Sequence, residues 1–241
     1  AMLLEQKIMK RFHENVKVQH TEKTDGNPQK EDEQTGTEKS SEKDAGSSEV
    51  EALEASIVPG QYPIMGESSI QTSQMVEYFN ESGENYPADA LAKGGAPDIE
   101  TFCRIYYEEA VQEGVRPEVA FAQTMKETGW LQYGGDAKIT QYNFAGIGTT
   151  GGGVPGNSYP DVRTGVRAQI QHLKAYATTE ALAEECVDDR YDYVTKGCAP
   201  YVEWLGQKEN PQGYGWATGE NYGYDIVEMI HDMWNTKIFI K

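Results

Sequence analysis

Apolar residues recur every three or four positions in five stretches of the chain, and this is the period of one face of a helix. The stretches cover residues 68–79, 98–114, 115–130, 164–178 and 221–234, with residues 86–98 expected as loop. We therefore predict a mainly helical domain. The side chains expected to face its core are Met75, Val76, Phe79, Phe102, Ile105, Tyr106, Ala110, Val166, Ile170, Leu173, Ala177, Ile226, Met229, Ile230 and Met233.

The helix expected over residues 115–130 is apolar on most of its sides, which is typical of a buried helix. Pro117 fits its first turn, where the missing N–H costs nothing, and Gly129 fits a left-handed residue just past its end. Asp98 is expected to cap the preceding helix, which should end at Gly114. The short connection between the two helices implies that they pack together.

Glu127 is the exception in this apolar helix. The negative end of the helix dipole and the apolar wall offered by Trp130 both disfavour its ionised form. A carboxyl that stays protonated near neutral pH is what a general acid requires. The alternative is a solvated glutamate at a fraying helix end.

Residues 133–160 are rich in glycine, so we expect loops with a small β-hairpin that line a binding site. The predicted fold class is thus α+β, predominantly α-helical, with a small glycine-rich β-lobe. The domain is expected to span residues 57–241. Before it, residues 1–20 have apolar residues four apart and predict a short amphipathic helix, and residues 21–56 have the composition of a disordered acidic linker.

The formal net charge of −18 argues against a nucleic-acid or anionic-membrane partner bound through charge. The sequence has no apolar run long enough to span a membrane. The four histidines lack the spacing of a metal site, so we expect no metal or cofactor. His172 is expected to be a structural residue. We also expect a monomer.

Three cysteines do not form a disulfide framework. Cys186 and Cys198 could pair around the segment between them, or all three thiols could be free. In either case Cys103 is expected to be a small buried apolar residue.

Aromatic and amide side chains gather around and after Glu127, and this combination suits a carbohydrate cleft. Sugar rings pack on aromatic side chains, and their hydroxyls need hydrogen-bonding groups. Gln123 lies four residues before Glu127 on the same helix face, where it could orient the acid or contact substrate. The predicted substrate-binding residues are Gln123, Trp130, Gln141, Tyr142, Asn143, Phe144 and Trp216.

Three motifs in order resemble those of glycoside hydrolase family 73, the glucosaminidase branch of lysozyme-like bacterial wall hydrolases. They are AFAQTMKETGWL at 120–131, QYNFAGIG at 141–148 and WATGENYGYDI at 216–226. The resemblance covers roughly residues 98–234. It implies a lysozyme-like fold and an endo-β-N-acetylglucosaminidase that cleaves the GlcNAc-β-1,4-MurNAc bond of peptidoglycan.

The resemblance also implies roles for individual residues. Glu127 takes the place of the general acid, and Tyr222 takes that of a tyrosine near the acid and the bound sugar. Asn143 and Phe144 take sugar-contacting places. Trp130 and Trp216 are expected as walls of the cleft.

The family is often assigned a second carboxylate in the β-lobe, but residues 149–160 contain no acid. Asp161 follows this segment and Asp136 precedes it. Two routes stay open: Asp161 activates water and the reaction inverts, or the 2-acetamido group of the substrate is the nucleophile and the reaction retains. The lack of a lobe carboxylate slightly favours the second route.

We expect a secreted or surface-tethered bacterial enzyme that acts on peptidoglycan glycan strands. The enzymatic alternative is a lytic transglycosylase or muramidase, which shares the glutamate at a helix end. The alternative from another class is a wall-binding module without activity.

Overall fold

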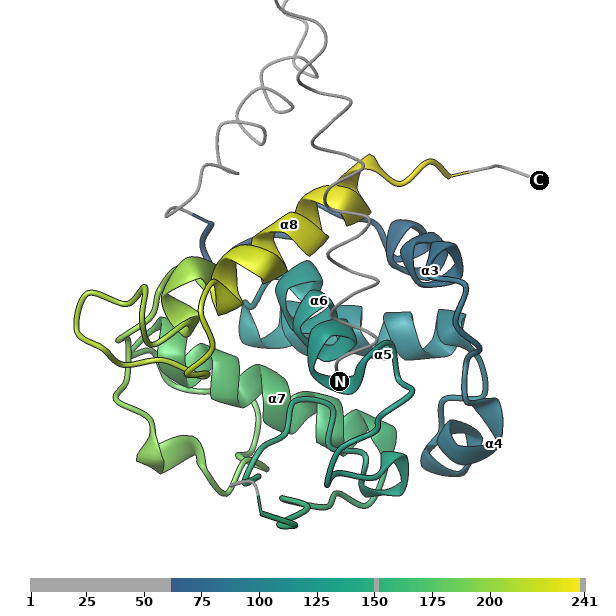
Figure 1. The fold of residues 1–241 in the computed structure, drawn as a ribbon, viewed down its shortest axis with the longest axis horizontal. Coiled ribbons are helices and arrows are strands. Elements are labelled where there is room, and N and C mark those ends of the chain that lie inside the picture. Colours follow the sequence, from purple (N-terminus) through teal and green to yellow (C-terminus); the bar gives the residue numbers. More distant parts are fainter. Residues whose placement is uncertain (1–61, 150–151, 239–241) are drawn as a thin grey trace, which may run out of the picture. The chain divides into compact units, whose positions relative to one another are not determined.

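The computed structural model describes residues 62–149 and 152–238, and these form a helical domain (Figure 1). The amphipathic helix predicted for residues 1–20 and the linker predicted for 21–56 lie outside the described residues. The helices are α3 (Thr72–Glu81), α4 (Ala88–Leu91), α5 (Ile99–Glu113), α6 (Pro117–Thr128), α7 (Val162–Ala177) and α8 (Tyr222–Asn235). Short 3-10 helices are η1 (Ala92–Gly94), η2 (Ile139–Gln141), η3 (Tyr191–Tyr193) and η4 (Val202–Leu205).

The five predicted helices are all present, and the expected loop over residues 86–98 is the part that was wrong. It contains α4 and η1. Among the side chains predicted to face the core, Val76 and Met229 are only partly buried, and the others are buried. The hydrophobic period therefore located the long helices correctly, whereas a single helical turn is too short to show that period.

The predicted caps of α5 and α6 are confirmed. The Asp98 carboxylate accepts a hydrogen bond from the Thr101 N–H at 2.7 Å. Gly114 ends α5 in the left-handed region at φ 73°, and Gly129 ends α6 in the same way at φ 58°. Pro117 is the first residue of α6.

Helix α6 lies at the centre of the domain, between α5, α7 and α8 (Figure 1). Its apolar residues from Val119 to Ala122 and Met125 are fully buried, so it is enclosed as its sequence predicted. Phe121 packs edge-on against Tyr106 of α5, with ring centroids 5.9 Å apart. This packing fixes the position of the helix end that carries Glu127.

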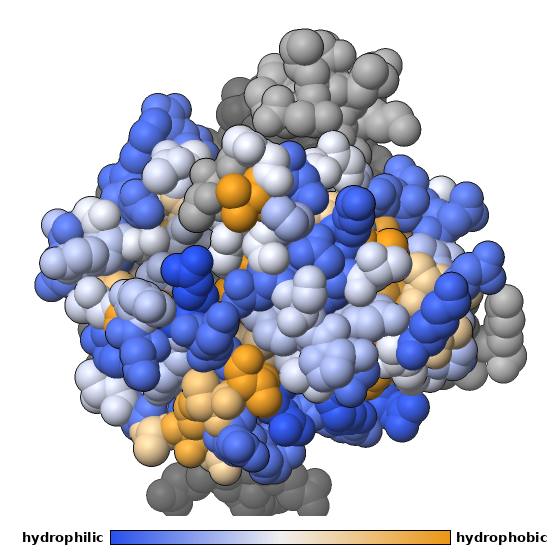
Figure 2. Space-filling model, turned by 90° about the horizontal axis from the view of Figure 1, so that it is seen from below, coloured by the Kyte–Doolittle hydropathy of each residue, from blue (hydrophilic) through white to orange (hydrophobic). Residues whose placement is uncertain are grey.

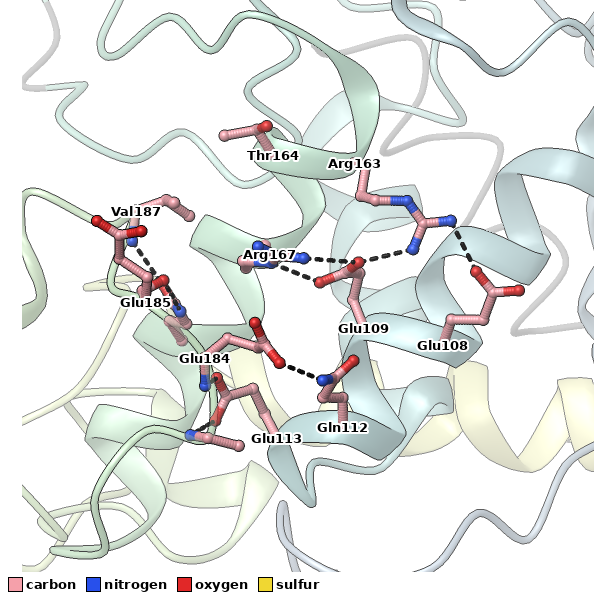
Figure 3. A network of polar contacts seen from close by, with 12 residues as sticks. Glu108, Glu109, Gln112, Glu113, Arg163, Thr164, Arg167, Glu184, Glu185 and Val187 are labelled. Atoms are coloured by element: carbon pink, nitrogen blue, oxygen red, sulfur yellow. Dashed lines mark hydrogen bonds and ion pairs between the residues drawn. The ribbon is translucent and has the colours of Figure 1, made fainter.

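An ion-pair network holds α7 against α5 (Figure 3). Arg163 donates to Glu108 and Glu109 at 2.7 Å, and Arg167 donates to Glu109 at 2.7 Å. Glu109 is only 2% exposed, and the two arginines supply the hydrogen bonds that its buried carboxylate needs.

A second pair between the same helices, Glu113 with Lys174, is buried and 2.9 Å long. Burial alone would raise the pKa of Glu113, but the N–H of Ala183, the Lys174 ammonium and the N–H of Glu184 outweigh it and lower the pKa. A lowered pKa in the folded state stabilises the protein above the unfolded pKa, and this stability is lost as the pH falls through the folded value.

We therefore expect Glu113→Gln to lower the free energy of unfolding by about 3 kcal/mol at pH 7, because Lys174 keeps a buried charge without its partner. The difference from wild type should shrink as the pH falls below about 4. Urea unfolding at several pH values measures both effects. Glu108→Gln, on an exposed pair of the same helix, should cost less than about 1 kcal/mol. Equal losses of unfolding free energy in Glu113→Gln and Glu108→Gln would contradict the conclusion that the buried Glu113–Lys174 pair stabilises the fold more than the exposed pair.

The glycine-rich segment does not form the predicted β-hairpin within its described residues, and no strand occurs in the described part of the chain. Isolated β-bridges, such as that between Met65 and Val115, occur outside the glycine-rich segment. Residues 133–149 and 152–160 contain η2 and turns, and several of their glycines have positive φ. A hairpin needs successive extended residues, which repeated left-handed residues interrupt.

All three cysteines are free thiols, so the Cys186–Cys198 pairing does not form. Cys103 is buried, as predicted. No helix within the described ranges is both long and apolar enough to cross a membrane. Figure 2 shows one face of the molecule as mainly hydrophilic, with hydrophobic residues in small separate groups.

Candidate active site

Glu127 lies in the last turn of α6, where the chain leaves the helix through an unusual left-handed turn. Gly129, Trp130 and Leu131 all have φ near +60°. For residues other than glycine, this conformation costs about 1 kcal/mol or more and persists only where the surroundings enforce it. Leu131 is buried, and its N–H donates to the Thr128 hydroxyl at 2.9 Å. Such strain is commonly found at functional sites.

Tyr222, the first residue of α8, meets Glu127 directly. Its hydroxyl donates a short hydrogen bond to Oε1 of Glu127, and it accepts one from Nε2 of Gln123 at 3.0 Å. Gly223 lets α8 lie close to η4, because a Cβ there would come within 2.1 Å of the Val202 carbonyl oxygen. The close approach of α8 and η4 thus brings Tyr222, which lies 95 positions after Glu127 in the sequence, into contact with the Glu127 carboxyl.

The loop after η2 reaches the other carboxyl oxygen of Glu127. A Cβ placed on Gly146 would lie 4.0 Å from Oε2, and Gly146 has φ +64°. Asn143 braces this loop: its side chain donates to the Ile147 carbonyl at 2.8 Å and accepts from the Ile147 N–H at 3.0 Å. Gly146 itself therefore adds no side chain beside Oε2, and the side-chain atom nearest to that Cβ position is the Thr149 hydroxyl oxygen at 3.6 Å.

The Glu127 side chain reaches solvent, although protein atoms crowd its carboxyl. This crowding desolvates the charged form and raises its pKa, while the Tyr222 hydrogen bond and the Lys126 ammonium act in the opposite direction. Lys126 is itself paired with Asp225 at 2.6 Å. The net effect is a raised pKa, as a general acid needs.

Five of the predicted substrate-binding residues have buried side chains that leave little surface for a sugar. Gln123 is fully buried. Phe144 packs on Phe102, with ring centroids 5.2 Å apart. The amide of Gln141 donates to carbonyl oxygens of residues 155–157. The side chains of Tyr142 and Asn143 are buried as well. Buried amides of this kind satisfy loop backbone groups. The sugar contacts of the five residues stay a prediction.

The two predicted tryptophans are half-buried and lie in different places. Trp130 packs on Tyr78 of α3, with ring centroids 5.0 Å apart. Trp216 packs edge-on against His172 at 4.8 Å. His172 also contacts the Asp188 carboxylate at 2.6 Å, as expected of a structural histidine. The remaining exposed faces of the tryptophans could still contact a ligand.

Asp161 and Asp136 are both used elsewhere. The Asp161 carboxylate caps α7 by accepting from the Thr164 N–H at 2.7 Å. Asp136 is exposed and accepts from the Gly153 N–H at 3.1 Å. Neither hydrogen-bonds to Glu127 or Tyr222 in the described part of the chain.

A buried hydrogen-bond chain behind Tyr222 escaped the sequence analysis. Nε2 of Gln169 donates to Oε1 of Gln123 at 2.9 Å and to the Ala120 carbonyl at 3.0 Å. Its Oε1 lies 2.8 and 2.9 Å from the hydroxyls of Tyr106 and Thr124. Those hydroxyls also share a hydrogen bond at 2.6 Å, so one of them donates to the other and the other donates to Oε1. The one signal in the sequence was a glutamine on the inward face of α7, three residues after Val166. No cluster of metal-ligating side chains exists among the described residues.

Comparison with known proteins supplies an independent finding. The glucosaminidase family, described as mannosyl-glycoprotein endo-beta-N-acetylglucosaminidase, matches residues 103–235. An uncharacterized protein of Borreliella burgdorferi is 38% identical over 135 residues, which are 56% of this chain and 63% of that relative. The chain therefore matches less than two thirds of the relative's length. No solved structure matches significantly.

Proposed function

Because this chain belongs to the glucosaminidase family, glycoside hydrolase family 73, we propose that it hydrolyses the GlcNAc-β-1,4-MurNAc bond of peptidoglycan with Glu127 as general acid. The observation that carries the proposal is the Glu127–Tyr222 pair: a carboxyl with a raised pKa, held by a buried tyrosine and reached by solvent. Its substrate would be a glycan strand, and it would act at the cell surface, where peptidoglycan lies.

The proposed reaction needs one protein acid. Protonated Glu127 transfers its proton to the glycosidic oxygen as the C1–O bond breaks. The carbonyl oxygen of the substrate's 2-acetamido group attacks C1 and forms an oxazolinium ring. Water then attacks C1 and opens the ring, and its proton returns to the Glu127 carboxylate. The product keeps the β configuration.

The proposal is tested by digesting purified peptidoglycan, reducing the new ends with borohydride and identifying them by mass spectrometry. We expect reduced GlcNAc ends. Reduced or anhydro MurNAc ends would instead identify a muramidase or a lytic transglycosylase. Wall binding without any new ends would mean that the domain is a binding module.

The retaining route, in which the 2-acetamido group is the nucleophile, and the inverting route, in which Asp161 is the base, differ in what they predict for a variant of Asp161. Asparagine also caps helices well, so Asp161→Asn should keep the cap of α7 while removing the carboxylate. We expect its kcat to stay within about threefold of wild type, because it is not the base. Proton NMR of a defined glycan during digestion should show the β anomer first. An early α anomer, or a loss of about a hundredfold in this variant, would establish the inverting route.

A further inference from the structure

In the hydrogen-bond chain from Ala120 to Glu127, each bond has a defined donor and acceptor. The backbone carbonyl of Ala120 determines which group donates at each step. The Ala120 carbonyl oxygen can only accept, so the atom of Gln169 that lies 3.0 Å from it must be the amide nitrogen. The amide oxygen of Gln169 then faces the hydroxyls of Tyr106 and Thr124. These hydroxyls also hydrogen-bond to each other, so one of the two donates to the amide oxygen. The opposite orientation would place two acceptors against each other.

The orientation of Gln169 determines that of Gln123. The same Gln169 nitrogen lies 2.9 Å from Gln123, so the Gln123 atom there must be its oxygen. The Gln123 nitrogen is therefore the atom that lies 3.0 Å from the Tyr222 hydroxyl, and it donates to that hydroxyl. Both glutamines are fully buried, so water does not compete for these groups.

The Tyr222 hydroxyl already accepts from Gln123, so its own hydrogen goes to its other partner, Oε1 of Glu127. Burial, together with the charge of Glu127, raises the pKa of Tyr222 well above its usual value, so the phenol keeps this hydrogen. Oε1 is thus occupied as an acceptor. A proton on the carboxyl belongs on Oε2, the oxygen nearest Gly146.

We infer that the chain from Ala120 through Gln169 and Gln123 fixes Tyr222 as a donor to Glu127 and so places the catalytic proton on Oε2. The inference rests on the proposed role of Glu127 as the acid. Gln123 and Gln169 are positioning residues, because they act through Tyr222. The glycosidic oxygen would approach on the Gly146 side of the carboxyl, where Gly146 itself adds no side chain.

The inference predicts a change in proton affinity when the chain is interrupted far from the acid. In Gln169→Met, Gln123 loses its fixed orientation and can turn its oxygen toward Tyr222. Tyr222 then donates to Gln123, and Glu127 loses a hydrogen bond that favours its ionised form. The pKa of Glu127 should rise, so the alkaline limb of the kcat/KM profile should move up by about one pH unit. Tyr222→Phe should shift it in the same direction.

Gln171→Met is the matched control. Gln171 is also fully buried on α7, but it bonds to the backbone at Glu185 and Val187 rather than to the chain behind Tyr222. It should lose stability as Gln169→Met does and leave the pH profile in place. If Gln169→Met does not fold, Gln123→Met serves as the second variant, with the same expected shift.

A carbon-13 NMR titration of the Glu127 carboxyl in the full chain, assigned with Glu127→Gln, reads the same shift without any need for activity. Equal titration of Glu127 in wild type and in the Gln169 variant would overturn the inference, as would a downward shift. An inactive wild type whose Glu127 titrates higher in the Gln169 variant would instead support the hydrogen-bond chain and refute the proposed function.

Discussion

Glu127→Gln should lower kcat by about a thousandfold or more, because general acid catalysis contributes factors of this size. Glutamine keeps the size of the side chain, and its oxygen can still accept from Tyr222. It cannot supply a proton to the glycosidic oxygen. KM should change little, since the substitution removes an interaction that matters in the transition state.

The same variant should be more stable than wild type at neutral pH. A folded-state pKa above the unfolded value means that the folded protein binds the proton more tightly. Its stability therefore falls as the pH rises through the interval from the unfolded to the folded pKa. Glutamine has no such charge to desolvate, so its melting temperature should exceed that of wild type at pH 7, and the gap should close below about pH 4.

Release of reducing ends and thermal unfolding, measured on the same samples, check both expectations. Glu220→Gln is a suitable control, because Glu220 is exposed in the same motif as Tyr222 and its ion pair within the described residues is with Lys208. It should leave kcat and the melting temperature nearly unchanged. If Glu127→Gln kept a tenth of the activity, another group would be the acid.

The parts of the fold that the sequence predicted depend on neighbours in the chain. Asp98 caps α5 through the N–H three residues later, and Pro117 and Gly129 bound α6 through their own backbone preferences. The burial of α6 followed from its apolar residues alone. Such effects act within a turn or two, so they can be read from a single sequence.

The pairing of Glu127 with Tyr222 depends instead on residues that are far apart in the sequence. The helix position and apolar neighbours of Glu127 predicted a raised pKa, but its partner 95 residues away came only from the resemblance to a family. Gln169 was missed because its role depends on contacts with two other helices. A polar residue on an inward helix face shows that a buried partner exists but does not identify it.

The same limit applies to the glycine-rich segment. Gln141 and Asn143 looked like groups for sugar hydroxyls, yet their amides bind loop carbonyls. A loop without strands has many unpaired backbone groups, and side-chain amides must satisfy them. The sequence gives no sign of which partner an amide will choose when the backbone path is unknown.

The close contact between α7 and the loop that contains Tyr142 leads to the second prediction with a large expected effect, which concerns Gly165. A Cβ on Gly165 would lie 1.8 Å from the Tyr142 carbonyl oxygen, far inside van der Waals contact. Helix propensity alone predicts that alanine at this helical position stabilises the protein by about 1 kcal/mol. The packing predicts the opposite sign, because the first turn of α7 and the backbone of Tyr142 must move apart.

We expect Gly165→Ala to lower the free energy of unfolding by about 3 kcal/mol, as overpacking of a buried contact does. Activity should fall as well, since the displaced loop carries Gly146 beside Oε2 of Glu127. Denaturant unfolding and release of reducing ends measure the two effects. Gly219→Ala is the control, because a Cβ there meets no atom of the described residues within 4 Å. A stabilised Gly165 variant would mean that α7 and the loop are not in this close contact, and the position of Gly146 beside the acid would then lose its support.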